Sequence, residues 1–233
     1  SRAARSSAPA VAGAAPAAGA TVVLVGRREK TLTPVYDDIV AAGGPTPALF
    51  PMDFTRAAPE HYQALADGIA NDLGRLDGVL HAAGRLHALT PLAGLELAEW
   101  QRSLHVNLTA AFAVTQACLP LLLAAPDAAV VFVADRVGRR PKAYWGAYAA
   151  AKAGTDALLS LFAAEYGHRD NLRFHALDPG PLDTPLRTRV FPSGDPAAQP
   201  LESAVPACLH LLGPASRGIS GRRITVAELA ADA

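Results

Sequence analysis

From residue 21 onward, short runs of β-branched and other apolar residues alternate with longer stretches in which apolar residues recur at helical spacing. The short runs predict strands at 21–25, 47–51, 77–81, 129–134, 172–177 and 223–226. The stretches between them predict helices near 29–42, 59–73, 98–124, 145–166 and 202–212. Alternating strands and helices are typical of βα units, whose strands are parallel and whose crossovers are right-handed. The pattern therefore predicts an α/β fold, a doubly wound parallel sheet with helices on both faces.

The first nineteen residues differ in composition from the rest of the chain. They are almost entirely Ala, Ser, Pro, Gly and Arg, with no leucine, isoleucine or aromatic residue. Such a segment cannot form a core strand, so residues 1–19 are expected to be an atypical, disordered segment. A targeting peptide is the less favoured interpretation, because two prolines interrupt any amphipathic helix and no long apolar run is present. We expect one domain over 20–228 and a C-terminal tail over 229–233.

Length, charge and cysteines narrow the class of protein. The 233 residues carry a formal net charge of zero, and the basic residues form no long run, which argues against nucleic acid or a membrane surface as partner. The longest apolar run, 117–125, is too short to span a bilayer. Cys118 and Cys208 lie in apolar stretches without metal-ligand or redox-pair spacing. We therefore expect reduced core thiols, no metal site, a cytoplasmic location and a small-molecule or protein partner.

Tyr148 and Lys152 are the first candidates for chemistry, because four-residue spacing puts both side chains on one face of a helix. A nearby ammonium favours the phenolate and lowers a tyrosine pKa that is ordinarily about 10. The tyrosine then becomes a usable general acid/base. Read alone, the same spacing also occurs on ordinary solvated helix faces, so the rest of the chain has to decide.

In a doubly wound sheet, ligands bind beyond the carboxyl ends of the strands. Arg27 and Arg28 follow the first predicted strand, where two guanidinium groups suit the 2′-phosphate of NADP(H) better than the free ribose of NAD. A solvated basic loop is the alternative. Asp53 and Phe54 follow the second strand and could contact the adenine, although an aspartate at this point also suits a plain turn.

Small residues follow the third predicted strand. Ala83 and Gly84 permit a close approach of ligand to backbone, whereas His81 is interpreted as a packing residue. Asn107 is an amide on an otherwise apolar helix, so it needs hydrogen-bond partners if buried and can hold a water molecule.

The segment after the fifth predicted strand contains Pro179, Gly180 and Thr184. The proline and glycine break the backbone sharply and could wrap a flat ring, while the threonine hydroxyl could reach an amide or a phosphate. Without a ligand, the same residues would indicate only a turn.

Taken in this order, these positions resemble the short-chain dehydrogenase/reductase (SDR) family over residues 19–226. Within the family, the segments LDGVLH at 76–81 and AYWGAY at 143–148 are most similar to the YciK-like branch. The resemblance implies a Rossmann-like, three-layer α/β/α domain, an NADP(H) cofactor, oxidoreductase activity and assembly as a homodimer or homotetramer. It names no substrate.

The resemblance also implies roles for individual residues. Tyr148 would donate a proton to a substrate carbonyl during hydride transfer, and Lys152 would lower its pKa and bind the nicotinamide ribose. Asn107 would maintain a proton-relay water. Pro179, Gly180 and Thr184 would line the nicotinamide pocket.

The N-terminal segment departs from the family pattern. The family opens with a strand and a Thr-Gly-x-x-x-Gly-x-Gly turn that cradles the pyrophosphate at a helix N-terminus. Gly13 and Gly19 do not have this spacing, and no apolar strand precedes them. Because the pattern resumes cleanly at residue 19, our hypothesis is a frameshifted or misassigned start.

A second departure lies thirteen residues before Tyr148, where the family has a serine that donates to the substrate carbonyl and this chain has Asp135. A carboxylate has no proton to donate and would raise the tyrosine pKa. Losing such a donor typically costs on the order of a hundredfold in rate, unless Asp135 is protonated, Arg136 donates instead or the substrate is cationic. A plainer alternative is that Asp135 caps a loop.

Two functions follow. The leading hypothesis is an NADP(H)-dependent SDR oxidoreductase acting on a carbonyl or alcohol, with Tyr148 as general acid/base. The alternative is a catalytically impaired or inactive SDR-like protein that acts in binding or subunit interaction, because the glycine turn is missing and Asp135 replaces the serine. Affinity for the dinucleotide separates the two.

Overall fold

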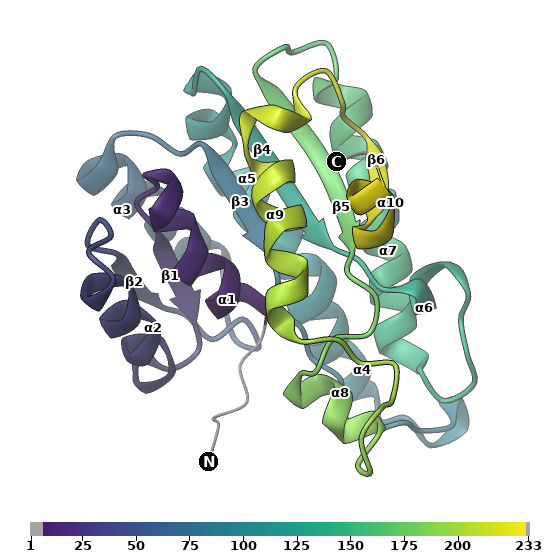
Figure 1. The fold of residues 1–233 in the computed structure, drawn as a ribbon. Helices are drawn as coiled ribbons and strands as arrows, with labels where there is room; N and C mark the ends of the chain where they lie inside the picture. The colour runs from purple at the N-terminus through teal and green to yellow at the C-terminus, as the bar shows by residue number, and fades with distance from the viewer. Residues whose placement is uncertain (1–6, 232–233) are drawn as a thin grey trace.

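The computed structural model describes residues 7–231, in which parallel strands alternate with helices (Figure 1). The strands are β1 (Val23–Gly26), β2 (Ala48–Pro51), β3 (Gly78–His81), β4 (Ala128–Val133), β5 (Leu172–Asp178) and β6 (Arg222–Thr225). Every strand pair is parallel. The predicted fold class, a doubly wound parallel sheet in a single α/β domain, is confirmed.

The strands form two sheets rather than one. β1 pairs with β2, and β3, β4, β5 and β6 form a four-stranded sheet in that order. Within residues 7–231, no strand hydrogen-bonds to both β1 and β3. Figure 1 shows the β1–β2 pair as a separate ribbon beside the larger sheet.

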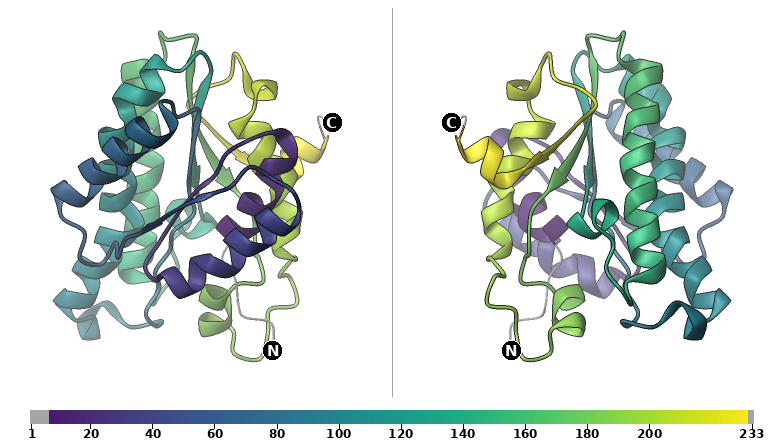
Figure 2. Two further views of the ribbon diagram at one scale, coloured as in Figure 1. Left: turned by 90° about the vertical axis from the view of Figure 1, so that its left-hand side faces the viewer. Right: turned by 90° about the vertical axis from the view of Figure 1, so that its right-hand side faces the viewer.

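Helices cover both faces of the sheets, as the edge-on views of Figure 2 show. One layer contains α1 (Ser7–Ala14), α2 (Glu29–Ala41) and α9 (Val205–Leu212). The opposite layer contains α3 (Pro59–Leu73), α7 (Gly146–Tyr166) and a continuous stretch made of α4 (Leu97–Leu104), the π-helical turn η3 (His105–Thr109) and α5 (Ala110–Ala124).

The core is built on both faces of β4. Val130 and Phe132 point into the cluster formed with α3, α5 and α7, whereas Val131 belongs to the cluster formed with α9. Successive residues of a strand point to opposite faces, so a strand covered on both sides is a continuous apolar run. The side chains Val130, Val131 and Phe132 are all fully buried.

The N-terminal segment differs from the sequence expectation. Residues 1–6 lie outside the described residues, but α1 and the 3₁₀ turn η1 (Ala15–Ala18) follow, ending at Gly19 with a φ of 81°. Val11 is 4% exposed and packs with Ala207 and Leu211 of α9. A segment of small residues needs few large side chains to pack, because its backbone can approach its neighbours closely.

The predicted C-terminal tail is also partly ordered. A short helix, α10 (Val226–Ala231), crosses the expected boundary at 228, and its Val226 and Leu229 pack against the cluster around α9. Residues 232–233 are outside the described part.

One helical stretch, Leu97–Ala124, is long and apolar enough to cross a membrane by length and composition. Its residues Cys118 and Leu122 are fully buried against the sheet and α3. Core helices of globular proteins commonly meet the same criterion, so the stretch carries little weight as evidence for a membrane.

Both cysteines are buried free thiols, as the sequence predicts. Burial raises the pKa of Cys118 to about 11 and that of Cys208 to about 12. Such thiols are poor nucleophiles.

Candidate active site

Tyr148 and Lys152 lie on the buried face of α7, one turn apart. They are 6% and 5% exposed, so the pair is not part of a solvated helix face. Lys152 donates from Nζ to the carbonyl of Val133 at the end of β4, at 2.7 Å. Its ammonium is 5.7 Å from the centre of the Tyr148 ring. An alanine-rich sequence favours helix here and lets α7 pack closely on its neighbours.

Asp135 contacts the tyrosine directly. It is the N-cap of α6 (Arg136–Arg139), where Oδ1 accepts a hydrogen bond from the Val137 amide at 3.0 Å. Its other oxygen, Oδ2, accepts from the Tyr148 hydroxyl at 3.0 Å. The carboxylate therefore caps a turn and also holds the phenol, so the two interpretations of Asp135 are compatible.

The pKa of Tyr148 shifts in the direction opposite to the one expected from Lys152. Burial and then the Asp135 carboxylate raise it well above 10, because both disfavour a phenolate. Burial also lowers the pKa of Lys152 to about 8, although Asp135 opposes that change. In this arrangement Tyr148 is a neutral phenol whose proton is directed at Asp135.

Asn107 lies in the π turn η3, and π turns often occur at functional sites. Its side-chain oxygen accepts from the Arg85 amide at 2.9 Å, and its nitrogen donates to the carbonyls of Arg85 (2.7 Å) and Ser103 (2.8 Å). The side-chain amide thus clamps the loop after β3, while the backbone carbonyl of Asn107 accepts from Thr155 at 3.3 Å.

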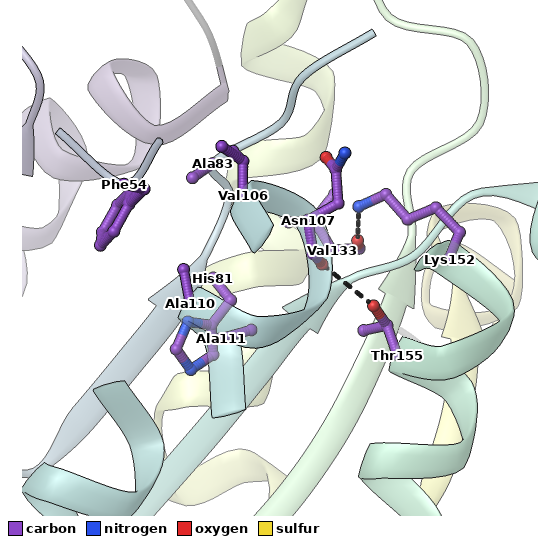
Figure 3. Close-up of a pocket in the computed structure, with 10 residues that line it drawn as sticks. All are labelled: Phe54, His81, Ala83, Val106, Asn107, Ala110, Ala111, Val133, Lys152 and Thr155. Carbon is purple, nitrogen blue, oxygen red and sulfur yellow. Dashed lines mark hydrogen bonds between the residues drawn. The ribbon is translucent and has the colours of Figure 1, made fainter. Parts of the chain in front are cut away.

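A cavity opens beside Lys152, between the carboxyl ends of β2, β3 and β4 (Figure 3). Its walls come from strand ends and from the helices that cover them: Phe54, His81, Ala83, Val106, Asn107, Ala110, Ala111, Val133, Lys152 and Thr155. The cavity brings together four candidate residues from different parts of the sequence, namely Phe54, Ala83, Asn107 and Lys152.

His81 is held as a packing residue. Its ring stacks on Phe132, with centres 5.0 Å apart, and Nε2 lies 2.8 Å from the Thr115 hydroxyl. Thr115 gives its own proton to the Ala111 carbonyl, so we assign the donor role to His81 Nε2. Burial, with a smaller effect from Lys152, lowers the pKa of His81 to about 3, and the ring stays neutral.

The residues predicted to bind the adenosine lie at the ends of β1 and β2. Arg27 and Arg28 are exposed. Burial tends to raise the pKa of Asp53, but hydrogen bonds from Thr55 and the charge of Arg27 outweigh it and lower the pKa. Asp53 Oδ1 accepts from the Thr55 amide at 2.9 Å, which is the turn geometry that the sequence left as an alternative.

The loops after β3 and β5 meet under α8 (Pro185–Val190), a helix that the sequence analysis did not predict. Gly180 has a φ of 71°, a conformation that favours glycine. Thr184 caps α8 by accepting from the Arg187 amide at 3.1 Å. A Cβ on Gly84 would lie 3.3 Å from Leu186, so the small residue permits this close approach.

These residues fit a nicotinamide dinucleotide at its two ends. Arg27 and Arg28 can hold a 2′-phosphate, and Lys152, whose Nζ donates to the Val133 carbonyl, is the candidate for the nicotinamide ribose. Ala83 and Gly84 are exposed at the strand ends between them, and Pro179 is half-buried. In the described residues, no glycine-rich turn supplies amides for the pyrophosphate, and no group of three or more His, Cys, Asp or Glu is placed to hold a metal ion.

An ion-pair network behind Lys152 escaped the sequence analysis. Arg223 of β6 bonds to Asp156 of α7 at 2.5 Å and to Asp178 of β5 at 2.6 Å. Asp156 tends to raise the pKa of Lys152, which helps to keep its ammonium charged. The position of Asp156, four residues after Lys152, was the available signal, whereas the contact with Arg223 depends on tertiary packing.

The sequence profile of the family described as "short chain dehydrogenase" matches residues 7–194. The chain is 40% identical over 204 residues to the "Uncharacterized oxidoreductase YciK" of Escherichia coli K12. The aligned region covers 87% of this chain and 80% of that protein. A short chain dehydrogenase from Pseudomonas syringae has a similar solved structure, with a TM-score of 0.92, 36% identity and coverage of 95% of this chain and 90% of that one. A short chain dehydrogenase of Escherichia coli CFT073 complexed with NADPH superposes with a TM-score of 0.90 at 36% identity, covering 95% of this chain and 92% of that one.

Proposed function

Because the chain belongs to the short chain dehydrogenase family, we propose that it is an NADP(H)-dependent oxidoreductase that acts on a carbonyl or alcohol group, with Tyr148 as general acid/base. The bound nicotinamide would supply or accept the hydride. The observation that carries the proposal is the buried Tyr148–Lys152 pair on one face of α7, with Lys152 anchored to the Val133 carbonyl at the end of β4. A phenol placed in this way can hold or release one proton at a defined atom.

The choice of NADP(H) over NAD(H) rests on two arguments. Arg27 and Arg28 follow β1 with exposed side chains, and neither is an acidic group that would bind a free ribose 2′-hydroxyl. The solved relative from Escherichia coli CFT073 is complexed with NADPH.

Further roles follow for the chain's own residues. Lys152 would bind the nicotinamide ribose, and Pro179, Gly180 and Thr184 would form one wall of the nicotinamide site. Asp53 and Phe54 would contact the adenine, with Ala83 and Gly84 beside the dinucleotide.

We also infer a homodimer or homotetramer in the cytoplasm. Phe112 on α5 and Leu161 on α7 are 40% and 59% exposed, which suits burial against a second copy. Two free buried thiols are compatible with a reducing compartment.

Calorimetric titration of the 233-residue chain with NADPH and NADH tests the function. We expect micromolar binding of NADPH and markedly weaker binding of NADH. A folded chain that binds neither would overturn the proposal and favour the second candidate, a non-catalytic SDR-like protein that acts in binding or subunit interaction. The separation of the two sheets and the carboxylate at Asp135 favour that candidate.

A further inference from the structure

Asp135 is a carboxylate beside Tyr148 that forms no ion pair within the described residues, although Lys152 acts on it at longer range. Its two oxygens accept from the Val137 amide and the Tyr148 hydroxyl. Among the described residues, no Lys, Arg or His nitrogen forms an ion pair with it within 4.0 Å. Lys152 directs its Nζ to the Val133 carbonyl instead. Asp135 is half-buried, so its charge is not fully hydrated either.

A site for a carbonyl substrate is expected to present hydrogen-bond donors, whereas the Asp135 carboxylate presents only acceptors. A carbonyl oxygen only accepts hydrogen bonds, and it would meet Asp135, which only accepts them when ionised. It would also compete with Asp135 for the proton of Tyr148. A cationic nitrogen that carries N–H groups would instead donate to Asp135 and be attracted by its charge.

One side of the pair is apolar, while the charges of Arg187 and Asp178 also act on Tyr148 at longer range. Tyr148 belongs to a cluster that includes Leu86, Val137 and Trp145, with Leu186 of α8 packed against it. The ring of Trp145 lies with its centre 5.9 Å from that of Tyr148. Apolar walls weaken solvent screening and so strengthen a charge interaction, and an aromatic face also attracts cations.

We propose that the substrate of this site is a C=N compound bound as its iminium ion, or the corresponding ammonium in the opposite direction, with Asp135 recognising the charged nitrogen and the cluster around Trp145 holding an apolar substituent. This inference rests on the proposed NADP(H)-dependent oxidoreductase and replaces its carbonyl or alcohol substrate with a C=N compound or the corresponding amine.

The chemistry balances without the missing serine. The reduction adds one hydride, the equivalent that the reduced nicotinamide supplies, to the iminium carbon. The π electron pair of the C=N bond becomes the lone pair of the nitrogen, and the cation is neutralised. Unlike carbonyl reduction, this step needs no proton, so a carboxylate in place of a hydroxyl donor does not hinder it. The neutral amine then takes up one proton from solvent and leaves as an ammonium.

Binding of a matched pair of probes tests the inference. The amine 2-phenylpyrrolidine is a cation at neutral pH, and 2-phenyltetrahydrofuran has the same shape without charge. We expect the wild-type chain to bind the amine about ten to a hundred times more tightly, with and without NADP⁺, as measured by calorimetry. Asp135→Asn retains an oxygen that can cap α6 and should abolish the preference, as should Asp135→Ser. Asp170→Asn changes the net charge by the same amount as Asp135→Asn, at an exposed turn after α7, and should preserve the preference for the amine.

Equal affinities for the two probes, or a preference that survives in Asp135→Asn with native circular dichroism, would overturn the inference. A parallel titration with NADPH keeps it separate from the proposed function. If the chain binds NADPH but does not prefer the amine, the proposed oxidoreductase function stands and the proposed substrate class is rejected. If the chain prefers the amine through Asp135 but does not bind NADPH, recognition of the cation by Asp135 stands and the proposed oxidoreductase function is rejected.

Discussion

The four-stranded sheet and the β1–β2 pair differ in how completely they are enclosed. In β4, all residues from Ala128 to Phe132 are fully buried, and the strand has partners on both sides. In the smaller sheet, Leu24 is buried, but its neighbours in β1 and all of β2 keep part of their surface exposed. The candidate acid/base groups are anchored to the enclosed sheet, whereas the residues proposed to select the cofactor follow the open pair. Proton transfer requires donor and acceptor groups held in a fixed geometry, whereas recognition of a 2′-phosphate requires positively charged side chains at an accessible edge of the sheet.

The largest expected effect is the loss of activity when the candidate acid of the enclosed sheet, Tyr148, is replaced. Tyr148→Phe, made in an Asp135→Ser parent so that ketone reduction has its donor, should lower kcat/KM for acetophenone on the order of 10²- to 10⁴-fold, because the acid is lost. The dissociation constant for NADPH should not change. Tyr166→Phe, which removes a hydroxyl at the other end of α7, is the matched control. A loss of less than threefold in Tyr148→Phe would separate the reaction from this tyrosine.

Next in size is the difference in packing between the two sheets. Phe174 of β5 is fully buried and stacks on Phe162 with centres 5.1 Å apart, so Phe174→Ala should lower the free energy of unfolding by about 3–5 kcal/mol. Phe50→Ala in β2 should cost less, since that side chain is only partly buried. Urea denaturation of both variants measures the contrast. Equal losses would mean that the β1–β2 pair is as tightly integrated as the larger sheet.

The pH dependence of the free energy of unfolding should also distinguish the two sheets, because the enclosed sheet contains a histidine without hydrogen-bond partners. His175 of β5 is fully buried, and neither ring nitrogen has a hydrogen-bond partner. Burial lowers its pKa to about 4, with a smaller contribution from Arg173. Between pH 6.5 and 4 the unfolded chain binds a proton that the folded chain does not, so stability should fall as pH falls, by up to about 3 kcal/mol.

His175→Leu should remove part of this slope, measured by urea denaturation at pH 7 and pH 4.5. His81 contributes with the same sign, so some slope should remain. His168→Leu, at an exposed position after α7, should leave the slope intact. An unchanged slope in His175→Leu would show that the ring is protonated or hydrated in the folded state.

The smallest expected effect tests the open pair. Arg27→Gln should weaken NADPH binding by about ten- to a hundredfold, the usual range for a charged hydrogen bond, and leave NADH binding within about twofold. Arg56→Gln removes another charge that acts on Asp53 and should leave the ratio of the two affinities unchanged. Parallel losses for both nucleotides in Arg27→Gln would place the 2′-phosphate elsewhere.

Periodicity predicted the regular elements well because burial on two faces leaves a strong pattern. The predicted strand at 172–177 matches β5 within one residue, and the predicted helix at 59–73 coincides with α3. The short helices α6 and α8 were missed, since elements of four to six residues carry too little periodicity. Helix α1 was missed because small residues and a proline with a single valine resemble a disordered composition.

Residue spacing predicted that Tyr148 and Lys152 lie together, but not the electrostatic environment of the tyrosine. Spacing placed Tyr148 and Lys152 together, yet the direction of the tyrosine pKa depends on burial and on Asp135, which reaches the helix from the end of β4. Likewise, the sequence marks Asn107 as an amide in need of partners, but its clamp on Arg85 depends on where the loop after β3 runs. Pairwise spacing within one helix is local information, and contacts between elements are not.

The π turn η3 has a consequence for the phase of its helix. A residue advances an α-helix by about 100°, so one extra residue in a turn rotates α4 relative to α5 by roughly that angle. The same continuous helix can then direct Asn107 at the loop after β3 and, further on, Cys118 and Leu122 at the core. Deleting one residue between His105 and Thr109 would restore a regular helix but set one of these two faces out of phase.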